Sequence, residues 1–265
     1  MTYIENIARR FKDQFADPIR ADANVLNQAL RVLAIWRSRL MADAFVKRHG
    51  ARILQGPFAG MDYLTAAAEG ALLPRLLGTY ESELHPAIEA FVAQGVDCVI
   101  DVGCAEGYYA VGLARMAPEV LVYAHDTNPE AQAACRELAA KNGVEDRVMV
   151  GGLFAPTDFE AFADQRCLVI CDIEGAEDDL LRPDLSPALA GMRLIVETHD
   201  LYRPGVLERL KERFAPTHDI QRLDLGHKTL PLPDWVGTLN HIDQLIAVWE
   251  WRSGPTPWLV MTPKA

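Results

Sequence analysis

The sequence contains no long hydrophobic run, since none of its 265 residues belongs to a stretch approaching about 18 apolar residues without a charge. The N-terminal residues also lack the apolar core behind a basic start that marks a secretory signal peptide. We therefore expect neither a membrane-spanning helix nor association with a membrane, and we predict a cytoplasmic protein.

Basic residues are in the minority, because 26 Lys and Arg face 37 Asp and Glu and leave a formal net charge of −11. Such a chain has no general electrostatic attraction to a polyanion. Nucleic acid is therefore not an expected partner.

Cysteine is scarce, and its number is odd. A structural zinc site favours closely spaced Cys and His residues in loops, whereas Cys167 and Cys171 lie along an apolar run. We interpret the cysteines as buried thiols: Cys98, Cys104, Cys135, Cys167 and Cys171.

Short apolar runs alternate with helical patterns along most of the chain, which is typical of a parallel sheet with helices on both faces. Strands are predicted over 97–102, 120–125, 147–152, 167–173, 193–198, 217–225 and 243–251. Helices are predicted over 83–94, 107–117, 129–141, 158–164, 175–181 and 204–213. The fold class is therefore α/β, a Rossmann-like, doubly wound, mostly parallel seven-stranded sheet with an antiparallel hairpin at one edge.

The first part of the chain has a different pattern. Apolar residues recur there at helical spacing, and the Gly56–Gly60 stretch then marks a junction. We predict an N-terminal helical extension over 1–55, serving as a cap or a homodimer surface, followed by the main domain over 56–265.

The stretch Asp-Val-Gly-Cys-Ala-Glu-Gly at 101–107 lies between a predicted strand and a predicted helix. Gly103 allows a sharp turn close to a ligand, and Gly107 leaves the next helix N-terminus accessible. Asp126 ends the next strand, where a carboxylate can accept hydrogen bonds from ribose hydroxyls. Together these features predict a nucleoside ligand at the carboxyl edge of the sheet.

The spacing of the glycines bears on which nucleoside is bound. A dinucleotide fingerprint is G-x-G-x-x-G, whereas Gly103 and Gly107 stand four apart, preceded by Asp101 and enclosing Glu106. These acidic groups would repel a pyrophosphate and would suit a ligand with an amine and a sulfonium, which favours S-adenosylmethionine.

The segment VIDVGCAEGYYAVGLA, with VYAHDTNPEA after it, resembles the first two motifs of the class I S-adenosylmethionine-dependent methyltransferases. The resemblance extends from about residue 80 to 251. It implies that Asp101 and the Gly103-Cys104-Ala105 backbone, before Gly107, meet the methionine part. It also implies that Asp126 meets the ribose, and that Thr127 or the Gly152-Leu153 turn meets the adenine. Glu81 would receive the amine.

Acidic residues also follow the fourth predicted strand. In the segment CDIEGAEDDLL, Asp172 and Glu174 reach the carboxyl end of the sheet, where Asp172 can also face the cofactor. The D-x-E-G-x-E pattern resembles the FkbM-like branch of the family, which often methylates hydroxyl groups of sugars and natural products. That branch often has a lysine where this chain has Ile170. We interpret Glu177 as a favourable charge in the first turn of a helix.

The fifth predicted strand ends in Glu197, His199 and Asp200, and the family sheet order places it beside the fourth. His199 is then the leading general base, assisted by Asp172 and Glu174. Alternatively, Asp172, Glu174, His199 and Asp200 hold a divalent metal, Mg²⁺ or Mn²⁺ on their oxygen ligands.

The sequence thus predicts an S-adenosylmethionine-dependent methyltransferase that acts on an oxygen of a small molecule. An N-methyltransferase is the nearer alternative. A nicotinamide-dependent oxidoreductase would need a further phosphate-binding glycine. A catalytically silent adenosyl-binding scaffold that acts through a partner also stays open.

Overall fold

The computed structural model describes residues 3–14, 23–65, 67, 70–226, 228 and 231–264. Residues 1–2 and 15–22 of the expected N-terminal helical extension lie outside the described residues. The rest of that extension forms α1 (Tyr3–Gln14) and α2 (Ala23–His49).

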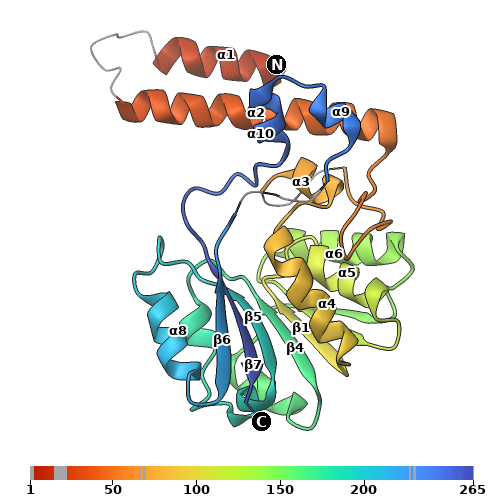
Figure 1. Cartoon of the computed structure of the whole chain (residues 1–265), viewed down its shortest axis with the longest axis vertical. Helices are drawn as coiled ribbons and strands as arrows, with labels where there is room; N and C mark the ends of the chain where they lie inside the picture. Colours follow the sequence, from red (N-terminus) through yellow and green to blue (C-terminus); the bar gives the residue numbers. More distant parts are fainter. Residues whose placement is uncertain are drawn as a thin grey trace.

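A seven-stranded sheet in the order β3-β2-β1-β4-β5-β7-β6 forms the centre of the molecule (Figure 1). The first five strands are parallel, and β7 runs antiparallel to both β5 and β6. The strands are β1 (Cys98–Val102), β2 (Leu121–His125), β3 (Val148–Gly151), β4 (Cys167–Cys171), β5 (Arg193–Glu197), β6 (His218–Leu223) and β7 (Trp258–Pro263). This arrangement confirms the predicted Rossmann-like, doubly wound sheet with an antiparallel edge.

Helices cover both faces of the sheet, and alternate residues of each central strand belong to different cores. In β1, Val99 belongs to the core under α4 (His85–Ala93), α5 (Tyr108–Met116) and α6 (Pro129–Lys141). Ile100 belongs to the opposite core, which includes α8 (Val206–Phe214) and the 3₁₀ segments η3 (Pro156–Phe162) and η4 (Pro187–Gly191). Burial on both sides explains why the central strands are almost wholly apolar. All five cysteines are free and buried, as expected.

The strand order reverses between β1 and β4. The chain passes from β1 outward to β2 and β3, and then returns to the other side of β1 as β4. The crevice outside the carboxyl ends of the strands at such a reversal is the usual ligand site of an open α/β sheet. The turn after β1 and the acidic stretch after β4 both begin there.

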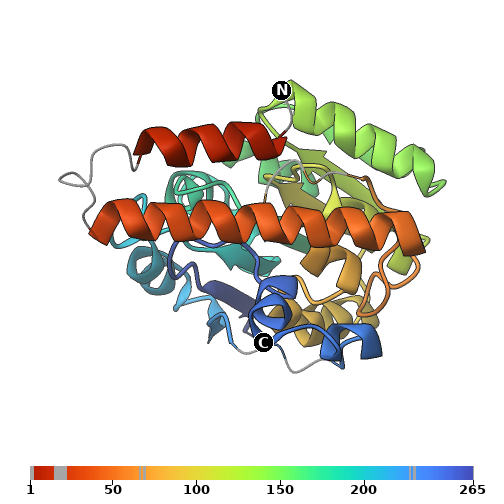
Figure 2. The same ribbon diagram turned by 90° about the horizontal axis from the view of Figure 1, so that it is seen from above.

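A helical cap lies above this carboxyl edge (Figures 1 and 2). It comprises α1, α2, α3 (Leu72–Leu77), α9 (Asp234–Gly237) and α10 (His241–Ala247). Helix α2 packs against α3 and α10, and the Arg37 guanidinium pairs with the Asp243 carboxylate at 2.6 Å. Because β7 runs away from the cap to the far end of the molecule, the parallel strands must end toward it.

The prediction of a strand over 243–251 is wrong. That segment holds most of α10, whose first turn is capped by Asn240, which accepts a hydrogen bond from the Asp243 N–H. The seventh strand is instead β7, beyond the range of the motif resemblance. Helix α3 was not predicted, and 158–164 is mainly 3₁₀.

Among the described residues, no helix has the length and apolarity that crossing a bilayer requires.

Candidate functional site

Two adjoining cavities lie at the carboxyl edge of the sheet. The first, about 520 Å³, is bordered by Asp126, Thr127 and the turn at 152–154. The second, about 290 Å³, is bordered by Glu81, Ala105, Glu197, His199 and Arg252, among others. Three residues line both cavities and therefore mark where they meet: Gly103, Asp172 and Glu174.

The backbone N–H groups of the turn after β1 form hydrogen bonds within the protein. The N–H groups of Gly103 and Cys104 donate to the His125 carbonyl at 2.8 and 3.0 Å, and the Ala105 N–H donates to Asp126 Oδ2 at 3.0 Å. A dinucleotide loop binds its pyrophosphate with free N–H groups. These three donors are already bonded, which argues against a pyrophosphate here.

Asp126 links the turn to the first cavity. Its Oδ2 accepts from Ala105 and its Oδ1 accepts from the Asn128 N–H at 2.7 Å. Each carboxylate oxygen has a further lone pair, so Asp126 keeps acceptor capacity for hydroxyl groups in the cavity that it lines.

Gly103 is required by packing as well as by conformation. Its φ is +84°, and a Cβ at this position would lie 1.7 Å from the Asp172 carbonyl oxygen. Only glycine therefore lets the end of β1 approach the end of β4 so closely. This contact sets the Asp172 backbone directly against the turn.

Several predicted cofactor residues do not line either cavity. Asp101 is 2% exposed and accepts a hydrogen bond from the Ala110 N–H in α5. Burial raises its pKa to about 7. Cys104 and Gly107 are also absent from both walls, whereas Glu81, Gly103, Ala105, Asp126, Thr127 and Asp172 each line at least one. Asp101, which the resemblance implies to meet the methionine part, is instead buried and bonded to α5.

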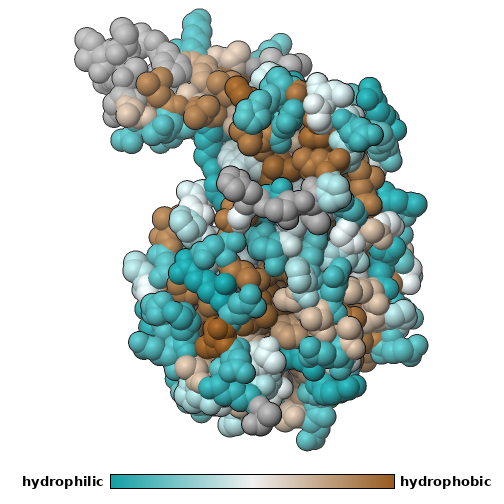
Figure 3. All heavy atoms as spheres, in the orientation of Figure 1, coloured by the Kyte–Doolittle hydropathy of each residue, from teal (hydrophilic) through white to brown (hydrophobic). Residues whose placement is uncertain are grey.

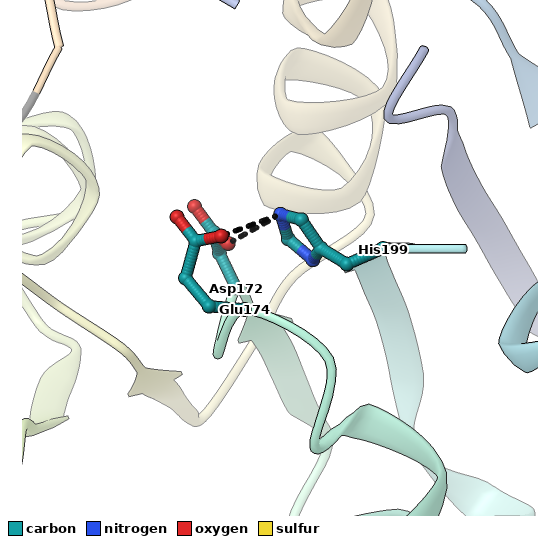
Figure 4. A group of neighbouring side chains, drawn as sticks. All are labelled: Asp172, Glu174 and His199. Atoms are coloured by element: carbon teal, nitrogen blue, oxygen red, sulfur yellow. Dashed lines mark ion pairs between the residues drawn. The ribbon is translucent and has the colours of Figure 1, made fainter. Parts of the chain in front are cut away.

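His199 faces the carboxylates of Asp172 and Glu174 (Figure 4), and Glu177 and Glu197 also lie close to its ring. Its Nε2 lies 3.4 Å from Glu174 Oε2, and 3.6 Å from both Asp172 Oδ1 and Glu197 Oε2. On the other side of the ring, Nδ1 lies 2.7 Å from Glu177 Oε1. The structure therefore brings together the predicted catalytic residues His199, Asp172 and Glu174.

Glu177 was interpreted as a helix-end charge, but its side chain is fully buried at the start of α7 (Glu177–Leu180). It accepts the Nδ1 proton of His199, which leaves Nε2 facing Asp172 and Glu174. Burial lowers the pKa of His199, but the hydrogen bond to Glu177 and the charges of Glu197, Glu177 and Glu174 outweigh it and raise the pKa. Glu177 is thus an orienting partner that the sequence interpretation missed.

A divalent metal ion fits part of the predicted ligand set. One ligand atom from each of Asp172, Glu174 and His199 lies within 4.8 Å of the others, and Asp172 Oδ1 has no hydrogen-bond partner among the residues that the structure describes. The carboxylate behind His199 also matches the arrangement that orients metal-binding histidines. Asp200 does not join this group, because its two oxygens accept the Gly205 and Leu207 N–H groups at 2.6 and 3.1 Å and cap α8.

Glu81 also lines the second cavity. Arg252 forms ion pairs with Glu81, Glu197 and Glu250, and thereby joins the segment before β1 to the end of β5. Burial raises the pKa of Glu81 to about 8, even though Arg252 opposes the shift. Arg252 was not predicted, because Glu81 and Glu197 lie far from it along the chain and offered no local signal.

Backbone strain is concentrated around the second cavity. Of the described non-glycine residues, Glu81, Ala105, Glu174 and Trp251 have φ between +46° and +65°, and all four line this cavity. Such conformations cost energy and persist where the surrounding structure imposes them, commonly at functional sites.

Comparisons with known proteins give partial matches. No family model matches the sequence. Over 85 residues the chain is 38% identical to a release factor glutamine methyltransferase from Deinococcus radiodurans, which covers 32% of this chain and 30% of that protein. The chain thus spans less than a third of the length of that curated relative.

Among solved structures, an O-methyltransferase from Bacillus cereus in complex with SAH is 14% identical, with a TM-score of 0.47 over 67% of this chain and 78% of that one. Cofactor-bound Rv0187 from MTB is also 14% identical, with a TM-score of 0.49 over 96% and 95%.

Proposed function

We propose that this chain is an S-adenosylmethionine-dependent methyltransferase that methylates a hydroxyl group of a small molecule. The observation that carries the proposal is the pair of adjoining cavities at the strand reversal, one lined by Asp126 and the other by the His199 group. The motif resemblance at 101–107 and 126 falls at this same place. The partial match to a glutamine methyltransferase adds support for methyl transfer.

The residues divide between the two cavities. Asp126 would bind the ribose and the turn at 152–154 the adenine, while Gly103 and Ala105 lie where the methionine part must pass. Glu81 would receive the amine. When bound, S-adenosylmethionine supplies the methyl group as a sulfonium substituent.

His199 would accept the acceptor's proton at Nε2. Glu177 holds Nδ1 and would stabilise the imidazolium that results. Asp172 and Glu174, at the junction of the cavities, would orient the hydroxyl group. Because a hydroxyl must lose its proton during transfer, a basic group at this point would serve O-methylation. N-methylation remains the alternative, since the partly matching relative is named as a glutamine methyltransferase.

A metal ion held by Asp172, Glu174 and His199 would lower the pKa of a coordinated hydroxyl group. Calorimetric titration with MnCl₂, with and without cofactor product, distinguishes the two forms of assistance. Saturable Mn²⁺ binding that Glu174→Gln weakens supports the metal. Absence of Mn²⁺ binding supports His199 as a general base that acts without a metal ion.

Calorimetric titration with S-adenosylhomocysteine and with NADH tests the proposal itself. We expect S-adenosylhomocysteine to bind at about micromolar level or tighter, and Asp126→Asn to weaken it about tenfold or more, the cost of a charged hydrogen bond. Asp146→Asn, on an exposed loop, is the matched control and should leave binding unchanged. Binding of NADH in place of S-adenosylhomocysteine would refute the proposal.

A further inference from the structure

A third cavity of about 380 Å³ lies between α2 and the segment that precedes α3. Its wall includes Trp36, Ser38 and Arg39 from α2, together with Gly70 and Trp251. Gly70 and Trp251 also line the cavity of the His199 group. The third cavity therefore adjoins the place where methyl transfer is proposed, on the side of the helical cap.

Three buried hydrogen-bond donors at this wall have no partner among the described residues. They are the indole Nε1 groups of Trp36 and Trp251 and the hydroxyl of Ser38, whose residue is only 1% exposed. A buried donor left unpaired costs about 1–3 kcal/mol. Three such donors around one cavity point to a ligand that supplies oxygen atoms to accept them.

The other residues that line the third cavity limit which chemical class of ligand can bind there. An apolar ligand would leave all three donors unpaired. An anion would require a buried cation, whereas the cation on this wall, Arg39, is exposed over the Trp251 ring, with the Asp43 carboxylate on the same wall. A group with several hydroxyls can accept from the indoles and can both donate to Asp43 and accept from Arg39.

We propose that this third cavity is an accessory subsite for an uncharged, polyhydroxylated part of the methyl acceptor. The assignment rests on the proposed function for its link to catalysis, because the adjoining cavity is the site of transfer. Helix α2 then takes part in acceptor selection, and Trp251, held at φ +65°, forms the wall between subsite and transfer site.

The proposal is tested by NMR on ¹⁵N-tryptophan-labelled protein, in which the indole N–H signals are followed. The variants Trp36→Phe and Trp251→Phe assign the signals of these two residues. The probes are methyl α-D-glucopyranoside and glycerol, with inorganic phosphate and 1-propanol for comparison at constant ionic strength. Trp258 is the internal control, because its Nε1 also lacks a partner but lies in the sheet core, away from the cavity. We expect the polyols to shift the Trp36 and Trp251 signals saturably and to leave the Trp258 signal in place.

Ser38→Ala should weaken the polyol effect about fivefold to tenfold, the usual result of losing one hydrogen bond, while Asp146→Asn should not change it. The proposal is overturned if neither polyol moves the two signals, or if phosphate or propanol moves them at lower concentration.

Repeating the titration with saturating S-adenosylhomocysteine separates the two proposals. If the polyol still shifts the two tryptophan signals, it binds outside the cofactor cavities, as proposed. If S-adenosylhomocysteine abolishes the shifts, the polyol binds within the cofactor cavities. If S-adenosylhomocysteine does not bind, the proposed function fails, while the cofactor-free titration still decides the chemistry of the subsite.

Discussion

At the scale of single residues, the site depends on how Glu177 and His199 are paired. Glu177 is buried and bonded to one ring nitrogen, so the other nitrogen is directed at Asp172 and Glu174. The charge on Glu177 therefore sets both the orientation of His199 and its basicity. Glu177 has this role because its side chain is buried. The sequence shows only an acidic residue in the first turn of a helix, and it does not show that the residue is buried.

Glu177→Gln should lower the pKa of His199, because it removes the Glu177 charge that raises this pKa and leaves only a neutral acceptor for Nδ1. The stability that protonated His199 contributes is present below its unfolded pKa and is lost as pH rises through the folded one. This loss should occur at lower pH in the variant. NMR titration of the His199 Cε1–H signal measures the midpoint, with His218, bonded to the Met192 carbonyl, as the reference. An unchanged or higher His199 midpoint would contradict the assignment.

Asp101→Asn should remove a pH-dependent cost of folding. The native pKa of Asp101 is raised to about 7 by burial, from an ordinary value of 3.8. The folded protein thus retains a proton that the unfolded chain releases, and stability falls as pH rises between these values. The difference in the free energy of unfolding between the variant and wild type should therefore shift by about 2–4 kcal/mol in favour of the variant from pH 4 to pH 8. Urea unfolding of both proteins at the two pH values measures this shift. A stability difference that does not change with pH would show that the pKa of Asp101 is not raised in the folded protein.

At the scale of secondary-structure elements, the site exists because β1 and β4 end against each other. The turn at Gly103 contacts the Asp172 backbone, and the Gly103 and Cys104 N–H groups bond to the end of β2. Three strand ends are therefore held in one fixed arrangement. The cavities lie on either side of it.

Gly103→Ala should destabilise the protein by about 3 kcal/mol or more, since it adds a backbone clash to the cost of a positive φ. Gly143→Ala is the matched control, because Gly143 also has a positive φ but a Cβ there meets open space. That variant should cost only about 1 kcal/mol. Chemical denaturation compares the two, and equal losses would show that the contact with Asp172 has no energetic weight.

Local patterns predicted β1 to β6 closely, because buried parallel strands appear as short apolar runs bounded by turns. The last strand was misplaced because the apolar, tryptophan-rich segment at 243–251 resembles a strand, whereas its Asn240 cap starts a helix. In the site, residues directly at strand ends, such as Asp126, Asp172 and His199, could be found from sequence. Arg252 could not, since its partners Glu81 and Glu197 are brought to it only by the tertiary fold.

At the scale of the whole molecule, the helical cap contacts the second cavity on one side and solvent on the other. Arg31 of α2 donates to the carbonyl of Arg252 at 3.2 Å, so the cap holds the segment that closes the second cavity. Hydrophobic residues gather among hydrophilic ones on the face of the cap that Figure 3 shows. Leu30 and Ile242 are each 68% exposed and, with Leu245, border an apolar groove.

Dimerisation through residues 1–55 stays a prediction, and this surface is where we expect it. Leu30→Glu should weaken the dimer about tenfold or more by placing a charge in an apolar contact. Leu185→Glu, at an exposed leucine outside the cap, should not. Analytical ultracentrifugation measures the association, and a monomeric wild-type protein would contradict the prediction.

A crystal structure of the protein with S-adenosylhomocysteine tests the proposed roles of the two cavities most directly. We expect the adenosine in the first cavity, with its ribose on Asp126 and its adenine beside the turn at 152–154. The sulfur should lie at the junction formed by Gly103, Asp172 and Glu174, facing His199. A product molecule bound away from Asp126, or a sulfur that does not face His199, would contradict the account.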